Sequence, residues 1–467
     1  MKTKLLLLLV IYNLQFTIYD CFSQDSMNVH LLYNWNDTTI PPNGYNAAYN
    51  ETWAFAINGR EYAVIGSTMG THIFDVTNID SAKQAAFIPG TAQGTNIVHR
   101  DFKSYQNYLY MVCDEGASTL QIADVSYLPD SAPLVYNSDS LFVRSHNIYI
   151  DTATAKMYVC GGAYQLEVYS LANPEIPVRL LRCPTDISWW QTTVGYVHDA
   201  YSRNDTVYCN AQNNGLFIVD FSNIANPQLI GSLTQYPFKG YNHSGWMNEA
   251  GNIYAFADET HGMDIKICDV SDLSNIQVKD TVNSNVAPTS IPHNIIIRGN
   301  YMYVSYYYDG LYIWNISNPS NAILVGFYDS CTIPNSTSYQ GAWGVNPNLP
   351  SGKVTLSDMQ NGLFVLDVSQ ALGVKEAAAG SGRWQVYPNP SSGKFTVSVN
   401  NLTIQPFNHL TIYNLLGEMV YRSVGNEPMT NGLITIDLSN QPKGIYFYQV
   451  VHQLTDKTVS MGKLIVE

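Results

Sequence analysis

The stretch Leu216-Phe217-Ile218-Val219-Asp220-Phe221 decides the fold, because close variants of it return along the chain at a nearly constant spacing. Seven copies align on their fifth residue, which is Asp, Asn or Ser, and successive copies lie 49, 46, 50, 49, 46 and 52 residues apart. The other six copies begin at Thr71, Leu120, Leu166, Ile265, Leu311 and Leu363. A period of this length, with several strand-like runs in each copy, is typical of a β-propeller or a β-solenoid.

Each repeat unit divides into four short strands joined by turns rich in Gly, Asn and Asp, which are hairpin signals. The third strand is almost continuously apolar, so both of its faces should be buried, as they are between stacked propeller blades. In unit four the strands are expected at 196–201, 206–210, 215–221 and 228–233.

The seventh unit lacks a fourth strand, because the chain passes from Asp367 directly toward a linker. Residues 31–37 precede the first complete unit and resemble residues 324–329, the fourth strand of unit six. We therefore predict that residues 31–37 close the ring by completing blade seven.

These repeats resemble the LVIVD-repeat propellers of secreted proteins with interchangeable surface anchors, the choice-of-anchor B type. The stretch 216–220 is the copy most similar to that motif, and the resemblance covers about residues 28–372. It implies a seven-bladed propeller, but it implies no single activity, because propellers host unrelated functions.

The first two dozen residues indicate export. Lys2 and Lys4 precede an apolar run from Leu5 to Ile11, and a more polar stretch follows, so residues 1–24 are expected to be a signal peptide. No later apolar run reaches the roughly 20 residues of a membrane span. The mature chain is therefore expected to have no transmembrane segment.

The charge balance argues against nucleic acid as a partner. Acidic residues number 37 against 23 basic ones, for a net charge of −14 without a basic cluster, which would repel a phosphate backbone. Six cysteines remain after Cys21, and none forms a Cys-x-x-Cys pair. Export makes disulfides possible, while their strand positions equally suit small buried hydrophobes.

A small-residue linker at 373–383 separates the repeats from a second region at 384–467, in which short strands predict a small β-sandwich. This region resembles the C-terminal sorting domain, type A, of the type IX secretion system. The motifs that carry the resemblance surround Pro388, Asn389, Pro390, Gly393, Gly417, Gly444 and Lys463.

The second resemblance implies that the protein meets the type IX secretion machinery and crosses the outer membrane of a Gram-negative bacterium. It further implies removal of the domain by a sortase-like peptidase, with attachment to surface lipopolysaccharide or release. Short Asp-Ser or Asp-Thr motifs, such as the one at Asp130, look like bacterial O-glycosylation acceptors of such exported proteins.

Half of the ten histidines occupy one position of the repeat, at steps of 47, 52, 45 and 50 residues. They are His99, His146, His198, His243 and His293, and the same position holds about Glu51 in unit one and Trp343 in unit seven. If the first strand of each blade is innermost, these side chains lie beside the axial channel. The turns between second and third strands reach the same face and carry carboxylates, including Asp114, Asp258 and Glu259.

Two interpretations of this face stay open from the sequence. The histidines could bond neighbouring blades as structural residues, with Asp75, Asp124, Asp220, Asp269 and Asp367 as partners. Alternatively, imidazoles and carboxylates that converge on one rim could bind a divalent metal ion or a polar ligand. Long aromatic connections, which contain Trp189, Trp190, Tyr236, Tyr241 and Tyr339, are expected on the same face and would suit a glycan or a peptide.

The sequence thus predicts an all-β protein, a seven-bladed β-propeller followed by a small C-terminal β-sandwich. The favoured function is an exported module that binds an extracellular glycan, peptide or protein through the histidine and aromatic face. The alternative is a metal-dependent hydrolase or lyase that uses the same face. Metal-ligand geometry among the histidines would favour the enzyme, and histidines bonded singly to neighbouring blades would favour a scaffold.

Overall fold

The computed structural model describes residues 25–373, 383–400, 407–414, 417–424, 433–452 and 458–467. The expected signal peptide and most of the expected linker lie outside these residues. The chain divides into two compact units, Met1–Val368 and Ser369–Glu467.

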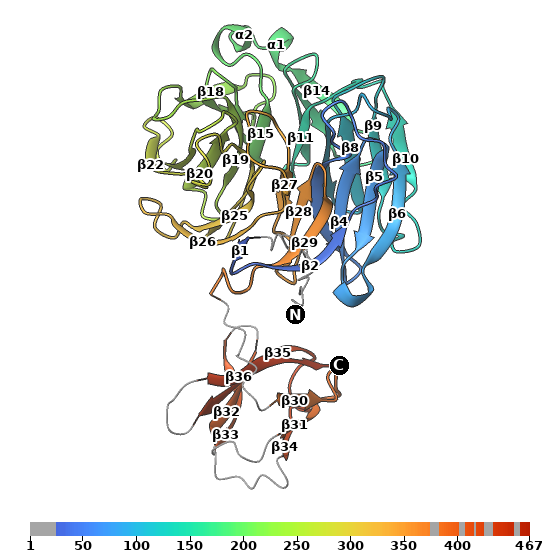
Figure 1. Ribbon diagram of the computed structural model, residues 1–467, viewed down its shortest axis with the longest axis vertical. Helices are drawn as coiled ribbons and strands as arrows, with labels where there is room; N and C mark the ends of the chain where they lie inside the picture. Colours follow the sequence, from blue (N-terminus) through green and yellow to red (C-terminus); the bar gives the residue numbers. More distant parts are fainter. Residues whose placement is uncertain (1–24, 374–382, 401–406, 415–416, 425–432, 453–457) are drawn as a thin grey trace, which may run out of the picture. The chain divides into compact units, whose positions relative to one another are not determined.

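The first unit consists of seven antiparallel sheets arranged around an axis, which confirms the predicted seven-bladed propeller (Figure 1). Blades one to three are β3 (Tyr49–Ile57), β4 (Arg60–Ser67), β5 (Gly70–Asp75) and β6 (Lys83–Pro89); β7 (Arg100–Tyr105), β8 (Tyr108–Cys113), β9 (Leu120–Asp124) and β10 (Leu134–Ser138); and β11 (Asn147–Asp151), β12 (Lys156–Cys160), β13 (Leu166–Ser170) and β14 (Val178–Arg182).

Blades four to six follow the same order. They are β15 (Asp199–Arg203), β16 (Thr206–Asn210), β17 (Leu216–Asp220) and β18 (Gln228–Leu233); β19 (Asn242–Met247), β20 (Ile253–Asp258), β21 (Ile265–Asp269) and β22 (Gln277–Val282); and β23 (Pro292–Arg298), β24 (Tyr301–Tyr306), β25 (Gly310–Asn315) and β26 (Ile323–Tyr328). A short 3-10 helix, η1 (Ile79–Ser81), precedes β6.

Blade seven joins the two ends of the propeller sequence. Its inner three strands are β27 (Ala342–Asn346), β28 (Val354–Asp358) and β29 (Gly362–Asp367), and its outer strand is β2 (His30–Trp35). β2 pairs antiparallel with β29, with His30 opposite Asp367 and Trp35 opposite Leu363. The ring therefore closes as predicted. A further strand, β1 (Ser26–Met27), which the sequence did not predict, adds a fifth strand to blade six.

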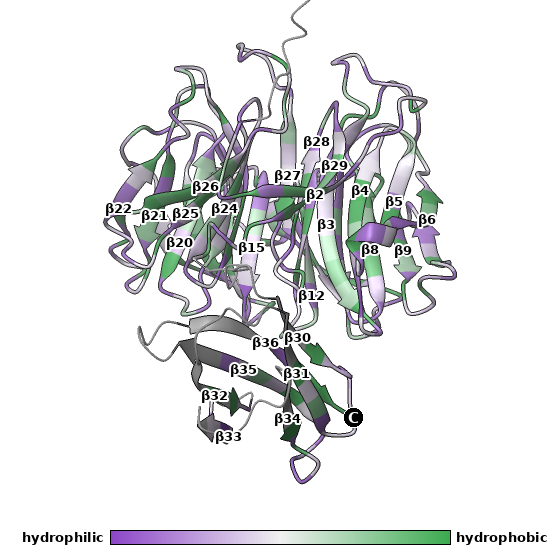
Figure 2. Ribbon diagram, turned by 60° about the horizontal axis from the view of Figure 1, so that its bottom comes forward, coloured by the Kyte–Doolittle hydropathy of each residue, from purple (hydrophilic) through white to green (hydrophobic). Residues whose placement is uncertain are grey.

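The first strand of each blade is the innermost, and each of these strands contacts the first strand of the next blade in an unbroken ring from β3 to β27 and back. The third strands are buried along nearly their whole length, because each lies between the faces of neighbouring blades. Figure 2 shows hydrophobic residues concentrated on the blade strands and hydrophilic residues in the loops that join them.

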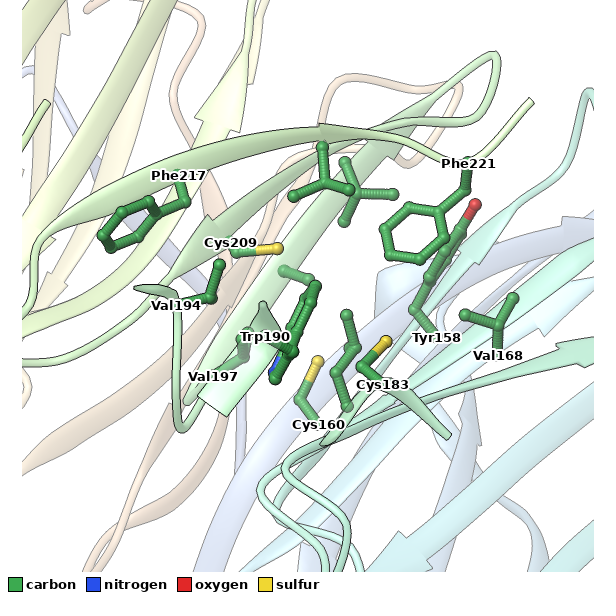
Figure 3. Close-up of a cluster of buried hydrophobic side chains, with 14 of the residues drawn as sticks. Tyr158, Cys160, Val168, Cys183, Trp190, Val194, Val197, Cys209, Phe217 and Phe221 are labelled. Carbon is green, nitrogen blue, oxygen red and sulfur yellow. The ribbon is translucent and has the colours of Figure 1, made fainter. Parts of the chain in front are cut away.

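The connection into blade four forms two short helices, α1 (Cys183–Asp186) and α2 (Trp190–Thr193). They carry Trp190 into a core cluster with Cys160, Cys183 and Cys209 (Figure 3). Trp190 is fully buried, its Nε1 donates to the carbonyl of Gly195 at 2.9 Å, and Trp189 packs against the same cluster. The prediction that this pair binds ligand is therefore wrong for Trp190, since apolar packing has removed its indole from solvent.

The six cysteines of the described propeller are buried and unpaired. In these positions they act as small core residues, which is the alternative to disulfide formation that the sequence left open.

The second unit contains two sheets. One is formed by β30 (Arg383–Tyr387), β31 (Lys394–Asn400) and β34 (Leu433–Asp437), and the other by β33 (Met419–Val424), β32 (Phe407–Tyr413), β35 (Gly444–His452) and β36 (Thr458–Val466). Apolar residues from both sheets, such as Val397 and Leu410, share one core, so the unit is the predicted β-sandwich.

The Pro-Asn-Pro motif of this unit is tied to its last strand. The side chain of Asn389 donates to the carbonyl of Lys463 at 2.7 Å and accepts from the backbone N–H of Ile465 at 2.9 Å. Gly393 has φ +106, and a Cβ there would lie 2.5 Å from the backbone of Ser439, so this position requires glycine. Motifs at the two ends of the unit thus meet in one structural element.

Candidate metal centre at the propeller axis

The five recurrent histidines lie where the chain enters the inner strands. His99, His146 and His198 each directly precede β7, β11 and β15, whereas His243 and His293 are the second residues of β19 and β23. Because all inner strands start at the same end of the channel, one repeat position becomes one ring of side chains.

The rings of these histidines contact one another in order around the axis. The centroid distances are 4.1 Å from His99 to His146, 4.1 Å from His146 to His198, 4.2 Å from His198 to His243 and 4.4 Å from His243 to His293. Trp343 completes the circle at 4.5 Å from His293 and 5.5 Å from His99. We call these six side chains the axial ring.

Hydrogen bonds orient two members of the axial ring. The Nδ1 atom of His293 donates to the carbonyl of Trp343 at 2.6 Å, and the Nδ1 atom of His146 donates to Asp114 at 2.9 Å. In the neutral form of each ring the proton stays at Nδ1 and Nε2 keeps its lone pair, which is the arrangement of metal-ligating histidines. The Nδ1 atoms of His99, His198 and His243 are buried and have no hydrogen-bond partner.

Two of the predicted carboxylates reach the axial ring. Besides Asp114, Glu259 lies with its Oε2 3.6 Å from the Nε2 of His243 and accepts a hydrogen bond from the hydroxyl of Tyr307 at 2.6 Å. The side chains of His146 and Glu259 are each 16% exposed, so this end of the channel is open to solvent beside them.

Asp258, the third predicted carboxylate, is engaged elsewhere. Its carboxylate pairs with Lys266 at 2.6 Å and accepts from the backbone N–H of Gly240 and the hydroxyl of Tyr236. Both members of this ion pair are completely buried, so their attraction neutralises two charges inside blade five. The structure does not bring Asp258 to the histidines.

Burial sets the protonation of the ring. Desolvation, reinforced by the neighbouring imidazoles, holds the pKa values of His99, His198 and His243 well below the ordinary range, and burial lowers the pKa of His293 to about 3. Burial also opposes protonation of His146, but its hydrogen bond to Asp114, together with the negative charges of Asp114, Glu259 and Asp199, outweighs burial and raises its pKa. Four of the five imidazoles are therefore neutral at pH 7, as metal ligands must be.

Burial raises the pKa of Glu259 to about 7, although the hydrogen bond from Tyr307 acts in the opposite direction. Near neutral pH this carboxyl group therefore exchanges a proton readily.

Two groups of side chains among the described residues could each hold one metal ion. The ligand atoms of His146, His198 and His243 lie within 4.8 Å of one another, and so do those of His243, Glu259 and His293. Two ligands of a tetrahedral zinc ion lie about 3.4 Å apart, so side-chain shifts of about 1 Å would complete either site. His243 belongs to both groups.

The aspartates proposed as structural partners of the histidines do not fill that role. The carboxylates of Asp75, Asp124, Asp220 and Asp269 each accept the backbone N–H of the residue two positions later. These aspartates end the third strands, at the face opposite to the one where the first strands begin. The alternation of strand direction therefore separates them from the axial ring, and this part of the structural interpretation is wrong.

Glu51, expected in the histidine position of blade one, lies further along the channel. It accepts from the backbone N–H of Thr52 at 2.9 Å and from the side chain of Asn294. A small cavity there is also lined by Asp101, Asp199 and Lys103, and Lys103 pairs with Asp101 at 2.9 Å. Burial, with repulsion from Asp101, raises the pKa of Glu51 to about 8, and burial raises that of Asp199 to about 7.

Replacement of Glu51 by glutamine should flatten the pH dependence of stability. The folded protein raises the pKa of Glu51 from 4.5 to about 8, so it favours the protonated form. The resulting stabilisation is complete below about pH 4.5 and is lost as the pH rises through 8. We expect Glu51→Gln to gain stability relative to the wild type between pH 5 and pH 9, measured by urea unfolding.

The matched control for this experiment is Glu249→Gln, which removes one carboxyl group from an exposed position, and the gain of stability with pH should be larger for Glu51→Gln than for this control. A profile for Glu51→Gln parallel to that of the wild type would show that the carboxyl group of Glu51 titrates alike in the folded and unfolded chains.

Sequence reasoning missed Tyr307, which contacts Glu259 and also packs on His293 at 4.9 Å between ring centroids. The residue that directly follows the second strand is Asp114, Glu259 and Tyr307 in blades two, five and six. The repeat alignment therefore places Tyr307 at the position of these carboxylates, although its contact with Glu259 of the adjacent blade is not visible in the alignment. In blade three the same position is Gly161, where a Cβ would lie 2.4 Å from the Cβ of His146.

Two further aromatic residues lie on the face of the axial ring, as expected. Tyr241 packs edge-on against His198 at 5.4 Å, and Tyr339, which is 45% exposed, packs against Tyr307 at 5.4 Å. They leave an aromatic rim beside the group of His243, Glu259 and His293.

Comparisons with known proteins agree with the repeat and with the C-terminal unit. The family model of the LVIVD repeat matches residues 204–235 and 292–330, and that of the secretion system C-terminal sorting domain matches residues 385–467. No curated protein matches the chain in sequence. None of the described helices is long and apolar enough to cross a membrane.

Among solved structures, the chain is similar to the β-propeller domain of Cps50 (Swd1) from Myceliophteria thermophila, at 11% identity and a TM-score of 0.49. That match covers 72% of this chain and 98% of the other. A match to the computationally designed protein Ika8, at 10% identity and a TM-score of 0.43, covers 69% and 96%. The choice-of-anchor B type and the O-glycosylation stay predictions. The chain thus carries LVIVD repeats within its β-propeller and ends in a secretion system C-terminal sorting domain, which indicates export by type IX secretion to the surface of a Gram-negative bacterium or beyond.

Proposed function

We propose that this exported propeller is a metal-binding protein, which holds a divalent transition-metal ion in the axial ring and binds an extracellular ligand there. The observation that carries the proposal is the convergence of four buried imidazoles and one partly buried imidazole on one axis, three of them with an Nδ1 atom that has no hydrogen-bond partner. A buried nitrogen without a partner is costly, and a metal ion would remove that cost.

The donor set indicates the class of metal. Neutral imidazoles with one carboxylate suit zinc, copper, nickel or iron, whereas calcium and magnesium prefer oxygen ligands. Asp114 and the carbonyl of Trp343 orient His146 and His293 from outside the ligand set, as is usual around metal-ligating histidines.

An ion held by three side chains keeps open coordination positions, and such positions bind water or a ligand atom. Beside the axial ring, Tyr241 and Tyr339 offer aromatic faces to the remainder of a glycan, a peptide or a protein. A hydroxyl, carboxylate or imidazole of that ligand would complete the coordination.

A metal-dependent hydrolase or lyase is the second candidate, and Glu259 favours it if the ion is held by His146, His198 and His243. This carboxyl group lies beside His243 and has a pKa raised by burial to about 7, which suits a general base at neutral pH. Turnover that is lost in Glu259→Gln, while metal binding persists, would assign this function; binding without turnover would leave the binding function alone.

The C-terminal unit extends the proposal to the final location. We infer that a sortase-like peptidase removes residues after the propeller, and that the mature protein is joined to surface lipopolysaccharide. Mass spectrometry of protein from the cell surface should then show a chain that ends before residue 384. A surface protein that retains residues 384–467 would contradict this inference.

Metal content decides the main proposal. The full-length protein is dialysed against Zn²⁺, Cu²⁺ or Ni²⁺ and then against buffer, and the bound metal is counted by mass spectrometry. We expect one or two ions per chain in the wild type and less than a tenth of that in His243→Leu, because His243 is common to both ligand groups. His30→Ala, which changes an exposed histidine of β2, should bind like the wild type. Equal metal contents in all three proteins would refute the metal centre.

A further inference from the structure

The other end of the central channel contains a cavity lined by aromatic side chains, and the proposed metal centre makes no use of it. The cavity has a volume of about 620 Å³. It is lined by the last residues of the inner strands and the turns that follow them, including 149–153, 201–204 and 246–249. From His198 to Arg203 the chain advances about 16 Å, since a strand rises about 3.3 Å per residue.

Three aromatic rings form one wall of this cavity. Tyr201 lies 5.1 Å from Tyr149 and 5.2 Å from Trp246, and Tyr149 lies 5.8 Å from Trp246. Trp53 lines the cavity as well and carries the Nζ of Lys103 4.7 Å from its ring centroid. Trp53 and Trp246 are only partly buried, so parts of their indole rings remain open to a ligand.

Two arginines reach the cavity without an acidic partner. Arg203 donates through Nη1 to the carbonyl of Asn248 at 3.3 Å, and Arg298 donates through Nη1 to the carbonyl of Leu349 at 2.9 Å and to that of Pro347. Among the residues that the structure describes, no carboxylate lies within ion-pair distance of either guanidinium. Each keeps its Nε and Nη2 donors, the pair that binds a carboxylate or a sulfate through two parallel hydrogen bonds.

Neither acidic residue of the lining pairs with the two arginines. Asp151 already accepts from the backbone N–H groups of Ala153 and Asp205 and from the hydroxyl of Ser202, so its oxygens are occupied. Glu249 is exposed at the edge of the cavity and forms no ion pair with Arg203.

We propose that this cavity binds an acidic saccharide, a sugar that carries a carboxylate or a sulfate. The apolar face of a sugar ring stacks on an indole or a phenol, and its acidic group would accept the paired donors of Arg203 or Arg298. Asn204 and Asn348 also line the cavity, and their amide side chains would bond hydroxyl groups of the sugar. The sugar site is independent of the metal centre, because it lies at the other end of the inner strands.

Isothermal titration of the full-length protein with a tetramer of galacturonic acid, and with a neutral tetramer of galactose as the reference, tests the proposal. We expect the acidic tetramer to bind at least about ten times more tightly, with an affinity that falls as salt is added. Arg203→Gln should weaken its binding at least about tenfold, which is the loss of about 1.4 kcal/mol. The matched control is Arg179→Gln, because Arg179 is exposed on β14, and it should bind like the wild type.

Unchanged binding by Arg203→Gln, equal binding of the two tetramers, or binding of neither would overturn the proposal. Equal competition by a tetramer of glutamate would also overturn it, since the cavity would then recognise carboxylates without the sugar. The variant His243→Leu separates the two proposed sites, because it should bind the acidic tetramer like the wild type whether or not the metal centre exists.

Discussion

Deletion of residues 28–37 should lower the melting temperature of the protein by roughly 10 °C, because it removes the strand that closes the propeller. β2 supplies the outer strand of blade seven, and Trp35 also packs on blade one, 4.7 Å from Phe74 and 5.5 Å from Tyr49 between ring centroids. Val29 is completely buried. The burial of Val29 and of the partly buried rings of Tyr33 and Trp35 contributes about 5 kcal/mol to the stability of the folded protein. Each kcal/mol corresponds to about 2 °C of melting temperature in a domain of this size.

The matched control for the closure is a deletion of residues 25–27. It removes β1, which only adds a fifth strand to a blade that already has four, so the melting temperature should change little. Differential scanning calorimetry of both variants measures the difference. If the variant that lacks residues 28–37 melts at the wild-type temperature, the stability of the ring does not depend on β2.

Saturation with Zn²⁺ should raise the melting temperature of the wild type by about 5 °C, and His243→Leu should abolish this rise. A ligand at a hundred times its dissociation constant stabilises the folded state by about 2.7 kcal/mol. Without metal, His243→Leu should melt at or above the wild-type temperature, because leucine replaces a buried imidazole whose Nδ1 has no partner. Thermal melts of the wild type and of His243→Leu, each in EDTA and in Zn²⁺, give the four melting temperatures.

A structural role for the histidines predicts the opposite pattern. If His243 served to join neighbouring blades, His243→Leu would melt several degrees below the wild type in EDTA, and Zn²⁺ would shift neither protein. His30→Ala should show the wild-type response in both buffers, since His30 is exposed and remote in sequence from the recurrent position.

The propeller could be predicted from the sequence because each blade repeats the same burial pattern. The apolar third strand and the hairpin turns recur about every fifty residues, and in blade four the predicted second and fourth strands have the observed limits. The closure was also predictable, since residues 31–37 resemble a fourth strand that unit seven lacks. In contrast, β1 is only two residues long, and β30 and β33 were not predicted, although each pairs with a strand adjacent to it in sequence.

The sequence predicted which histidines form the axial ring, but it did not predict which residues contact them. A repeat position places its members at equivalent points of seven blades, which is why five histidines and Trp343 meet. Their partners depend on strand direction and on loop packing. Direction alone moves Asp75 and its equivalents to the other face, and the short helices around Trp190 turn that indole into the core. The role of Tyr307 depends on an adjacent blade, which periodicity does not reveal.

An anomalous difference map from crystals of the full-length protein grown with Zn²⁺ tests the metal centre most directly. The structure predicts a peak on the propeller axis, about 2.1 Å from a ring nitrogen of His243 and from at least two further ligands among His146, His198, His293 and Glu259. A map whose zinc peaks all lie away from the axial ring would contradict the assignment and leave the histidines as packing residues.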